Sequence, residues 1–434
     1  MRNQALAKAW KSSALPPNWL KRQTPTENAS EQIENDVKAI INLVRKKGDA
    51  ALVELTEKFD KVRLNAEDLR VKPAEIEAAY REVSEAQISA LKLMKDKVST
   101  FESLKLKQAP LKTSKDGIII QSVLRPIESV GCYVPGGLAA YPSTLIMTAV
   151  PAKVAGVSRI VVCSPPTAKG AVNPLVLVAA DICGVTEVYK VGGAQAIAAL
   201  AYGTETIKPV KKIVGPGNRY VTVAKILVSR DVAVDMPAGP SEVLVIADET
   251  ADPKLIALDM ISQAEHGTDS VAGLITPSEK LAEEVQCWLE KTVAVAERRE
   301  IVEAALEKYG FIIICRDLAE AAELANAFAP EHIEIMTRDA EKIAEKITSA
   351  GLILVGAYSP VALSDYASGT NHVLPTGGFG SAFSGLSALD FVRRVNIIEC
   401  SREGLQRVQK LVAVMTAAEN LPNHYKALEA RLEK

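Results

Sequence analysis

The sequence predicts an α/β protein in which parallel sheets are flanked by helical segments at both ends of the chain. Three observations support this fold class. The chain is helical in pattern to about residue 110, short β-branched runs alternate with helical stretches from residue 118 onward, and residues 401–434 are helical again. Strands separated by helices of about ten to fifteen residues indicate βαβ units. The strands fall into two sets, 129–239 and 240–360, which predicts two similar α/β halves.

The individual elements follow from hydrophobic spacing. In SEQIENDVKAIINLVRKKG, Ser30 is the expected cap and Gly48 the end of a helix, and AEIEAAYREVSEAQISALKLMKDKVSTFESL continues the pattern. In the later run LIALDMIS, the spacing predicts that the core-facing residues are Leu255, Leu258, Met260 and Ile261. The predicted strands are residues 117–123, 159–166, 187–193, 211–217, 242–248, 271–276, 311–317, 332–337 and 352–356.

Composition and charge exclude several classes of protein. With 48% hydrophobic and 24% charged residues, the 434-residue chain is of the globular type, and its length suggests about three domains. A net charge of -2 provides no field that would attract nucleic acid or an anionic membrane. The six cysteines form no C-x-x-C pair, and neither a signal peptide nor a membrane-spanning apolar stretch is present. We therefore expect a cytoplasmic protein with no nucleic-acid or membrane partner.

Glycine- and proline-rich loops indicate a small-molecule site. They are residues 132–144, 191–196, 214–221, 236–242 and 368–381, and we expect such loops at the carboxyl ends of parallel strands. The loop VGPGNRYV resembles a dinucleotide fingerprint, but Tyr220 replaces its third glycine and no acid is placed to hold a ribose. A tight strand-to-helix turn would look the same. The glycine pair before Gln195 starts a helix whose amides suit phosphate, although close helix packing explains it equally well.

Histidines are a sharper signal for chemistry. The chain has four, and a single histidine is more often structural than functional. The four are His266, His332, His372 and His424. Three of them have an acid or an amide close by in sequence, and two lie in turn-rich segments. Because imidazole titrates near neutral pH and binds metals, this pattern favours catalysis or metal binding.

The segment ISQAEHG raises the question of which neighbour joins His266 at a metal. Carboxylates are common zinc ligands, so Glu265 is the first candidate. If the turn is helical, however, Gln263 lies three residues before His266 and shares its face, whereas Glu265 points away. The spacing therefore favours Gln263. The alternative is that Gln263 only caps the helix.

Two further segments combine acids with histidine. In APEHIEI, Glu331 and His332 precede a strand and suit general acid–base work, but both can reach one substrate only if the chain is kinked there. Two polar residues at a strand edge are the alternative. In LSDYASGTNHVLPTGG, Asp365 and His372 lie in a long loop, where functional groups concentrate. A hydrogen-bonded turn would be similar.

These segments together resemble the histidinol dehydrogenase family. The shared motifs occur in the family's order and spacing and are densest over residues 118–392: YVPGG, YPST, VGGAQAIAALAYGTE, VGPGN, DMPAGPSEVLVIAD, SQAEHG, APEH, DYASGTNHVLPTGG and GLSALDF. The resemblance implies two incomplete Rossmann-type parallel-sheet domains with helical N-terminal and C-terminal extensions. We expect an N-terminal arm (1–28), a metal-binding and catalytic α/β domain (29–128 with 240–385), an NAD-binding α/β domain (129–239) and a C-terminal helical segment (386–434).

The resemblance also implies a role for each candidate residue. The ligands of one zinc ion per subunit would be Gln263, His266, Asp365 and His424. Glu331 and His332 would be the acid–base pair, with His332 also touching substrate. The other substrate contacts would be Ser241, His372 and Glu419, and the NAD contacts Tyr133, Gln195 and Asn218. In a homodimer with shared sites, Glu419 and His424 would complete the site of the other subunit.

The reaction implied is the oxidation of L-histidinol through L-histidinal to L-histidine by two hydride transfers to NAD. Zinc would act as a template for substrate nitrogens, because a single carboxylate ligand leaves its site positive. His332 would remove the hydroxyl proton and act again in the second oxidation, and Glu331 would activate water. The alternatives are an NAD-linked aldehyde dehydrogenase with Cys132 as nucleophile, a zinc hydrolase using Glu331, and a non-enzymatic binding protein. Cys163 is expected in a buried strand.

Overall fold

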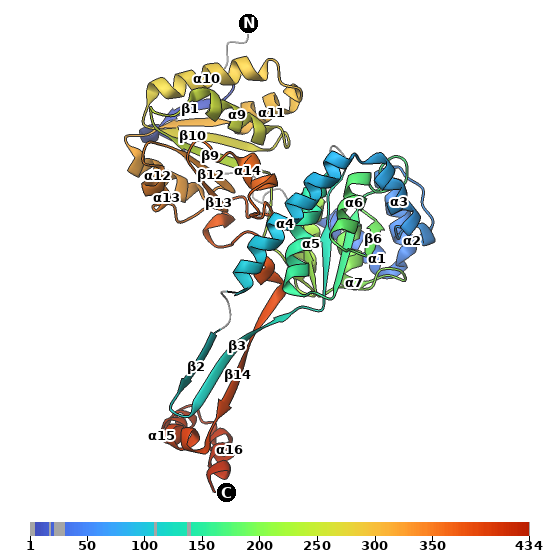
Figure 1. The fold of residues 1–434 in the computed structure, drawn as a ribbon, viewed down its shortest axis with the longest axis vertical. Helices are drawn as coiled ribbons and strands as arrows, with labels where there is room; N and C mark the ends of the chain where they lie inside the picture. The colour runs from blue at the N-terminus through green and yellow to red at the C-terminus, as the bar shows by residue number, and fades with distance from the viewer. Residues whose placement is uncertain (1–4, 17–18, 21–30, 108–110, 137–139, 434) are drawn as a thin grey trace.

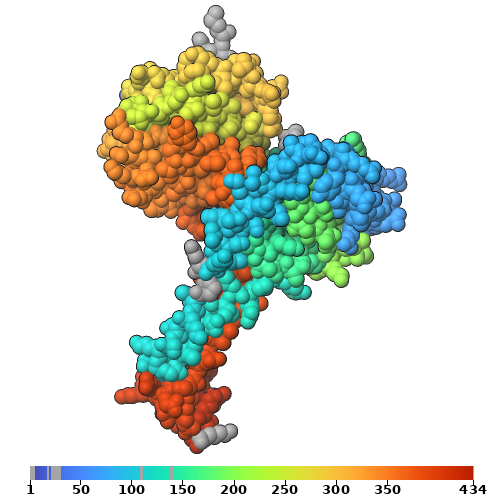
Figure 2. Space-filling model, in the orientation of Figure 1, coloured from blue at the N-terminus to red at the C-terminus, as the bar shows by residue number. Residues whose placement is uncertain are grey.

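The computed structural model describes residues 5–16, 19–20, 31–107, 111–136 and 140–433. Figure 1 shows two α/β lobes side by side and a long arm that projects from them and carries the C-terminus. The same division is visible on the molecular surface in Figure 2, where the arm stands clear of both lobes. Each lobe contains one parallel sheet, which confirms the predicted fold class. Within the described residues, no helix is long and apolar enough to cross a bilayer.

The first lobe is built on a six-stranded parallel sheet. Its strands, in spatial order, are β1 (Lys8–Lys11), β11 (Phe311–Ile314), β10 (Val271–Thr276), β9 (Glu242–Ala247), β12 (His332–Met336) and β13 (Leu352–Val355). Successive residues of β9 alternate between the two faces, because Val243 and Val245 join one apolar core and Leu244 and Ile246 the other. The helices of the lobe are α9 (Pro253–Ala264), α10 (Glu279–Val293), α11 (Arg299–Tyr309), α12 (Leu318–Phe328), α13 (Ala340–Ala344) and α14 (Val361–Tyr366).

The second lobe is built on a five-stranded parallel sheet. Its strands, in spatial order, are β6 (Glu187–Lys190), β5 (Arg159–Ser164), β4 (Ser129–Tyr133), β7 (Lys212–Val214) and β8 (Ala233–Val234). Cys132 faces one apolar core and Tyr133 the other, as the alternation of a strand requires. Helices following its strands cover both faces: α5 (Pro142–Ala155), α6 (Pro174–Ile182), α7 (Gly193–Tyr202) and α8 (Arg219–Val228).

The arm is a three-stranded antiparallel sheet capped by two helices. Its strands are β14 (Val392–Cys400), β3 (Ile118–Pro126) and β2 (Leu111–Lys115), and its helices are α15 (Arg402–Ala418) and α16 (Pro422–Leu432). The run at 117–123 is therefore a strand, as predicted, but it belongs to neither parallel sheet. Residues 386–434 are not helical throughout, because β14 precedes the two helices. Pairing between segments almost 280 residues apart leaves no local signal in the sequence.

The N-terminal helices pack on the second lobe, not the first. They are α1 (Glu31–Lys47), α2 (Asp49–Asp60), α3 (Pro73–Glu82) and α4 (Glu85–Lys107). Helix α1 contacts α7 and α8, α3 contacts α6, and α4 contacts α5, so the expected grouping of residues 29–128 with 240–385 is wrong. The apolar stripe of an amphipathic helix requires burial but does not specify the surface that buries it.

The described part of the expected N-terminal arm is also integrated into a lobe. Residues 8–11 form β1, which pairs with β11 as an edge strand of the six-stranded sheet. Trp10 stacks on Phe311 with their ring centroids 6.3 Å apart. Residues 1–4, 17–18 and 21–28 of the expected arm lie outside the described residues. Short 3₁₀ turns complete the fold at Ser12–Ala14, Ala66–Asp68, Phe379–Ser381 and Ala388–Phe391.

The two lobes meet at opposite ends of their sheets. Loops after β4 and β7 leave the carboxyl ends of the five-stranded sheet, as predicted for the loops 132–144 and 214–221. The six-stranded sheet instead contributes its amino ends, because residues 236–242 lead into β9 and Glu331 precedes β12. Residues 371–391 then cross between the lobes, with Val373 and Phe391 buried in a core of the second lobe. A cavity forms at this junction.

Candidate functional site

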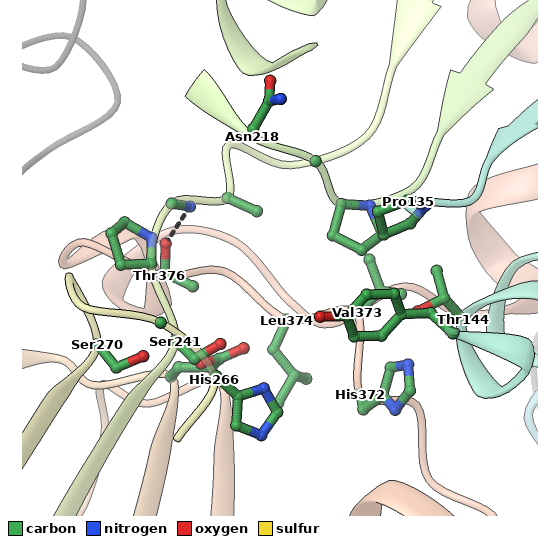
Figure 3. Close-up of a pocket in the computed structure, with 18 of the residues that line it drawn as sticks. Pro135, Thr144, Asn218, Ser241, His266, Ser270, His372, Val373, Leu374 and Thr376 are labelled. Carbon is green, nitrogen blue, oxygen red and sulfur yellow. Dashed lines mark hydrogen bonds between the residues drawn. The ribbon is translucent and has the colours of Figure 1, made fainter. Parts of the chain in front are cut away.

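The cavity between the lobes has a volume of about 530 Å³, which is within the range of small-molecule sites. Figure 3 shows residues from both lobes facing it, with Asn218 on one side and Ser241, His266 and His372 on the other. The predicted site residues that line it are Ser241, Gln263, His266, Glu331, His332, Asp365, His372 and Asn218. The predicted site residues that do not line it are Tyr133, Gln195, Glu419 and His424.

The end of helix α9 presents Gln263 and His266 to the cavity. Gln263 lies inside the helix and is buried, and the amide of His266 donates to the carbonyl of Gln263 at 3.3 Å. Glu265 does not line this cavity and instead borders a neighbouring one. The helix ends here with its carbonyl groups, whose partial negative charge favours a cation.

The predicted inward face of α9 is only partly correct. Met260 and Ile261 are buried as expected, whereas Leu255 and Leu258 are 37% and 39% exposed. Ile256 and Ala257 are the buried residues of the first turns. The apolar run covers more than one face of the helix, so its sequence alone does not decide which face of α9 packs against the core.

A kink before strand β12 brings Glu331 and His332 to the same cavity. Ala329, at the end of α12, has a left-handed backbone with φ of 48°, and Pro330 follows it. The Nδ1 atom of His332 then lies 3.6 Å from Oε2 of Glu331 and 3.2 Å from the carbonyl oxygen of Glu242. The chain is therefore kinked at this point, which is what Glu331 and His332 need in order to reach one substrate.

Neighbouring acids control the charge of His332. Burial disfavours the imidazolium, but the charge of Glu331 and its hydrogen bond, with Asp365 and the Glu242 carbonyl, outweigh it and raise the His332 pKa to about 9. Nε2 is buried, has no hydrogen-bond partner among the described residues, and lies 3.9 Å from Oδ1 of Asp365. A proton held on Nδ1 by Glu242 would leave Nε2 as the atom open to a ligand.

Asp365 and His372 have shifted pKa values of opposite sign. Burial, together with the charge of Glu331, raises the pKa of Asp365. Burial and the nearby His332 lower the pKa of His372 to about 4, so His372 is neutral at physiological pH. Its backbone is fixed by Asn371, whose side chain donates to the carbonyl of Met147 at 2.7 Å and accepts from the amide of Val373 at 2.8 Å.

The residues facing the cavity suit a metal ion, but this chain alone supplies an incomplete set. Oδ1 of Asp365 is buried without a hydrogen-bond partner among the described residues, and Gln263 and His266 line the same space with amide and imidazole ligand atoms. No group of three or more His, Cys, Asp or Glu side chains arranged to hold a metal occurs among the described residues. Gln263, His266 and Asp365 would supply three ligands, whereas a zinc site usually has four, so a further ligand would come from elsewhere.

His424 and Glu419 lie in the arm. Glu419 follows α15 and His424 is in α16, at the end of the arm remote from both sheets in Figure 1. Both are exposed. Within one chain the structure therefore separates them from the other candidate residues.

The predicted NAD contacts are divided between the cavity surface and the layer beneath it. Asn218 caps α8 by accepting from the amides of Tyr220 and Val221 at 3.0 and 3.2 Å. Tyr133 is buried, burial raises its pKa to about 12, and its hydroxyl accepts from the amide of Gly193 at 3.0 Å. Gln195 is buried in α7. Tyr133 holds the glycine turn through this hydrogen bond, and neither Tyr133 nor Gln195 forms the cavity surface.

Several cavity residues were missed by the sequence analysis. Thr376 bonds to the amide of Gly239, as the dashed line in Figure 3 shows, and so joins the loops that lead to β9 and follow His372. Tyr366 and Arg219 also line the cavity. Tyr366 and Arg219 directly follow the predicted residues Asp365 and Asn218, so adjacency was the available signal for these two.

The cysteine alternative receives no support from the geometry. Cys132 is fully buried and does not line the cavity. Burial raises its pKa to about 12, and it raises the pKa of the buried Cys163 as well. Both remain thiols at neutral pH, whereas a nucleophilic cysteine must reach the thiolate form.

Comparisons with known proteins agree with one another. The family model described as histidinol dehydrogenase matches residues 23–432. A histidinol dehydrogenase from Methanothermobacter thermautotrophicus is 46% identical over 402 residues, covering 93% of this chain and 94% of that protein. One from Bradyrhizobium diazoefficiens is 47% identical over 403 residues and 93% of each chain. The crystal structure of histidinol dehydrogenase from Elizabethkingia anophelis matches with a TM-score of 0.94 at 36% identity, covering 100% of this chain and 99% of that one.

Proposed function

The chain belongs to the histidinol dehydrogenase family, whose members are oxidoreductases of histidine biosynthesis, and on that premise we propose that it oxidises L-histidinol through L-histidinal to L-histidine with NAD as hydride acceptor. The observation that supports the proposal is one cavity that brings the candidate residues together: Gln263, His266, Glu331, His332 and Asp365. The loops after β4 and β7 of the five-stranded sheet line the same cavity. An acid–base pair beside possible metal ligands suits the oxidation of a substrate that is held by its nitrogen atoms.

His332 is the proposed base for the hydroxyl proton. A base must be neutral, and the raised pKa of about 9 favours the neutral ring of the metal-free protein only at alkaline pH. In the neutral ring, the Glu242 carbonyl, 3.2 Å from Nδ1, favours the remaining proton on that nitrogen and leaves Nε2 to accept one from substrate. Glu331 is the proposed base for the water that hydrates the aldehyde, and its Oε2 is held by the amide of Glu242 at 2.8 Å. His372, neutral because of its lowered pKa, and Ser241 would contact the substrate through hydrogen bonds.

A zinc ion would be held by Gln263, His266 and Asp365 together with His424 of a second subunit. When bound, such an ion supplies a positive template for the imidazole and amine nitrogens of L-histidinol. The unpartnered Oδ1 of Asp365 and the carboxyl end of α9 support this placement.

The NAD site is proposed at the loops of the five-stranded sheet. Asn218 lines the cavity and also caps the first turn of α8, whose positive N-terminal end suits a phosphate. Tyr133 would support NAD from beneath by holding the turn at Gly193, and Gln195 would do so from the first turn of α7. The loop itself is supported by buried Lys225, which donates to the carbonyl of Gly215 at 2.9 Å and pairs with Asp235.

A homodimer with shared sites is proposed from the exposure of the arm. Leu411, Val414 and Met415 of α15 are 63%, 59% and 47% exposed, and Ile398 of β14 is 64% exposed. Apolar side chains gathered on one projecting unit indicate a surface that another chain covers. Glu419 and His424 would then enter the cavity of that other chain, Glu419 pairing with the substrate amine.

The test is NADH production from L-histidinol before and after chelation of the purified protein. We expect two NADH per L-histidinol, loss of turnover on chelation, and recovery when zinc is returned. Manganese is a second metal to try, because mixed nitrogen and oxygen ligands are compatible with both. Failure of the zinc-loaded protein to reduce NAD with L-histidinol would contradict the proposal.

A further inference from the structure

Glu242 connects the segments that carry the proposed catalytic residues. It opens strand β9 directly after Ser241, and only 2% of its surface is exposed. Its Oε2 accepts from the amide of Glu331 at 3.2 Å, and its Oε1 accepts from the amide of Gly377 at 3.1 Å. One buried carboxylate therefore joins the start of β9, the start of β12 and the loop that follows His372.

The main chain of Glu242 makes two further contacts with the same residues. Its amide donates to Oε2 of Glu331 at 2.8 Å, and its carbonyl oxygen lies 3.2 Å from Nδ1 of His332. Glu242 and Glu331 are thus bonded reciprocally, each amide donating to the carboxylate of the other. The first pair in register between β9 and β12 is Val243 with His332, so this exchange locks the strand ends just before the ladder begins.

Glu242 supplies hydrogen bonds that fix both proposed catalytic side chains. Oε2 of Glu331 accepts from the amide of Glu242 at 2.8 Å, and Nδ1 of His332 lies 3.2 Å from the carbonyl oxygen of Glu242, with the carboxylate of Glu331 beside it at 3.6 Å. Catalytic groups must keep their geometry within about 0.5 Å to be effective, and they depend on the residues behind them to do so. Glu242 is placed to supply that support.

We propose that Glu242 is a positioning residue of the oxidation: its carboxylate holds the backbone of Glu331 and Gly377, and its peptide groups orient the carboxylate of Glu331 and the imidazole of His332. The inference rests on the proposed function. It assigns Glu242 no contact with substrate, because Glu242 does not line the cavity. It also accounts for an acid that is buried at the start of a parallel strand, where only hydrogen bonds make burial tolerable.

A glutamine at position 242 would fit the space but not the hydrogen bonds. The side chain accepts from two backbone amides, those of Glu331 and Gly377, and a glutamine offers one acceptor oxygen together with a donor NH₂. Glu242→Gln therefore places two donors face to face at Glu331 or at Gly377. Glu242→Asp keeps both acceptors but withdraws them by one methylene.

The experiment is a double-mutant cycle on the first oxidation, followed as first-turnover NADH from L-histidinol with zinc-loaded protein. We expect Glu242→Gln to lower this rate at least about tenfold in the parent and at most about twofold in His332→Asn, because a positioning residue acts through the group it positions. The KM for NAD should stay within about twofold, since the cofactor loops are untouched.

Glu102→Gln is the matched control. Glu102 is fully buried, its carboxylate accepts from the amide of Ala388 at 2.6 Å, and it does not line the cavity. Glu102→Gln should lower thermal stability, as Glu242→Gln should, but it should leave the first-turnover rate within about twofold of the parent. If Glu242→Gln does not fold, the cycle is run with Glu242→Asp.

Three results would overturn the inference. They are an unchanged rate in Glu242→Gln, a rate loss equal in the parent and in His332→Asn, and an equal rate loss in Glu102→Gln. An active parent with any of these results leaves the proposed function standing. A zinc-loaded parent that forms no NADH from L-histidinol overturns the proposed function, and the role of Glu242 falls with it.

Discussion

At the scale of the residue, the site is marked by two buried polar atoms. Nε2 of His332 and Oδ1 of Asp365 lie 3.9 Å apart, and neither has a hydrogen-bond partner among the described residues. Leaving such atoms unpaired costs about 1–3 kcal/mol each, so they mark positions where a ligand is expected. Nδ1 of His332 is by contrast held by Glu242. The two nitrogens of one ring are therefore prepared for different tasks.

The raised pKa of His332 predicts a pH-dependent stability in the metal-free protein. The folded pKa of about 9 exceeds the ordinary value of 6.5, so the stabilisation is complete below about pH 6.5 and is lost as pH rises through about 9. The shift corresponds to roughly 2–4 kcal/mol in free energy of unfolding. We expect the difference in free energy of unfolding between parent and His332→Asn to shrink over this range. A difference that is constant from pH 6 to 9.5 would contradict the shift.

At the scale of the element, helix termini and strand starts decide what reaches the cavity. Helix α9 ends at Ala264, and the turn that follows directs His266 inward beside Gln263 while Glu265 borders the neighbouring cavity. The left-handed Ala329 ends α12 and lets Glu331 and His332 share one side. In both cases a short irregular segment between regular elements does the positioning.

The end of α9 predicts a difference between two neighbouring side chains in zinc affinity. Gln263→Ala removes a proposed ligand and should weaken zinc binding at least about tenfold, whereas Glu265→Ala should change it less than about twofold. Zinc dissociation constants are measured by competition with a chromophoric chelator. Equal losses in the two variants would show that Gln263 has no special role. The two variants test neighbouring positions, because Gln263 lies in the last turn of α9 and Glu265 is the residue that caps its C-terminal end.

At the scale of the whole molecule, the arm separates residues that the sequence analysis placed in one site. His424 and Glu419 belong to α16 and the turn before it, while His266 and Asp365 line the cavity between the lobes. A second copy of the chain could bring its arm to this cavity, and the exposed apolar residues of α15 provide the surface for that contact. Only a dimer would then have a complete ligand set.

Mixing two inactive variants tests the shared site. His266→Ala and His424→Ala each remove one proposed ligand and should be inactive alone. If His424 crosses between subunits, a heterodimer has one cavity with both histidines intact, and reassociated equal mixtures should recover about a quarter of the parental rate, given statistical pairing of closed dimers. Recovery is measured as NADH formation after subunit exchange. No recovery in verified heterodimers would contradict sharing.

The sequence by itself determined most of the strands of the two parallel sheets and the chemical types at the site, but it did not predict β1, β2, β4, β8 or β14. Hydrophobic alternation and spacing predicted the nine strands from 117–123 to 352–356, and each of them is present. Helical spacing paired Gln263 with His266, and both line the cavity. These results follow because the hydrophobic periods of strands and helices depend only on residues close together in sequence. The residue types that bind metals or move protons can likewise be identified from the sequence itself.

The tertiary structure alone decided which pieces pack together. Helices α1 to α4 cover the five-stranded sheet, β1 extends the six-stranded one, and β14 pairs with β3 to build the arm. It also placed the cavity at the amino ends of one sheet and the carboxyl ends of the other, and revealed Glu242 behind the catalytic pair. Such contacts join segments hundreds of residues apart, and an apolar face or an unpaired strand edge specifies burial or pairing without naming its partner.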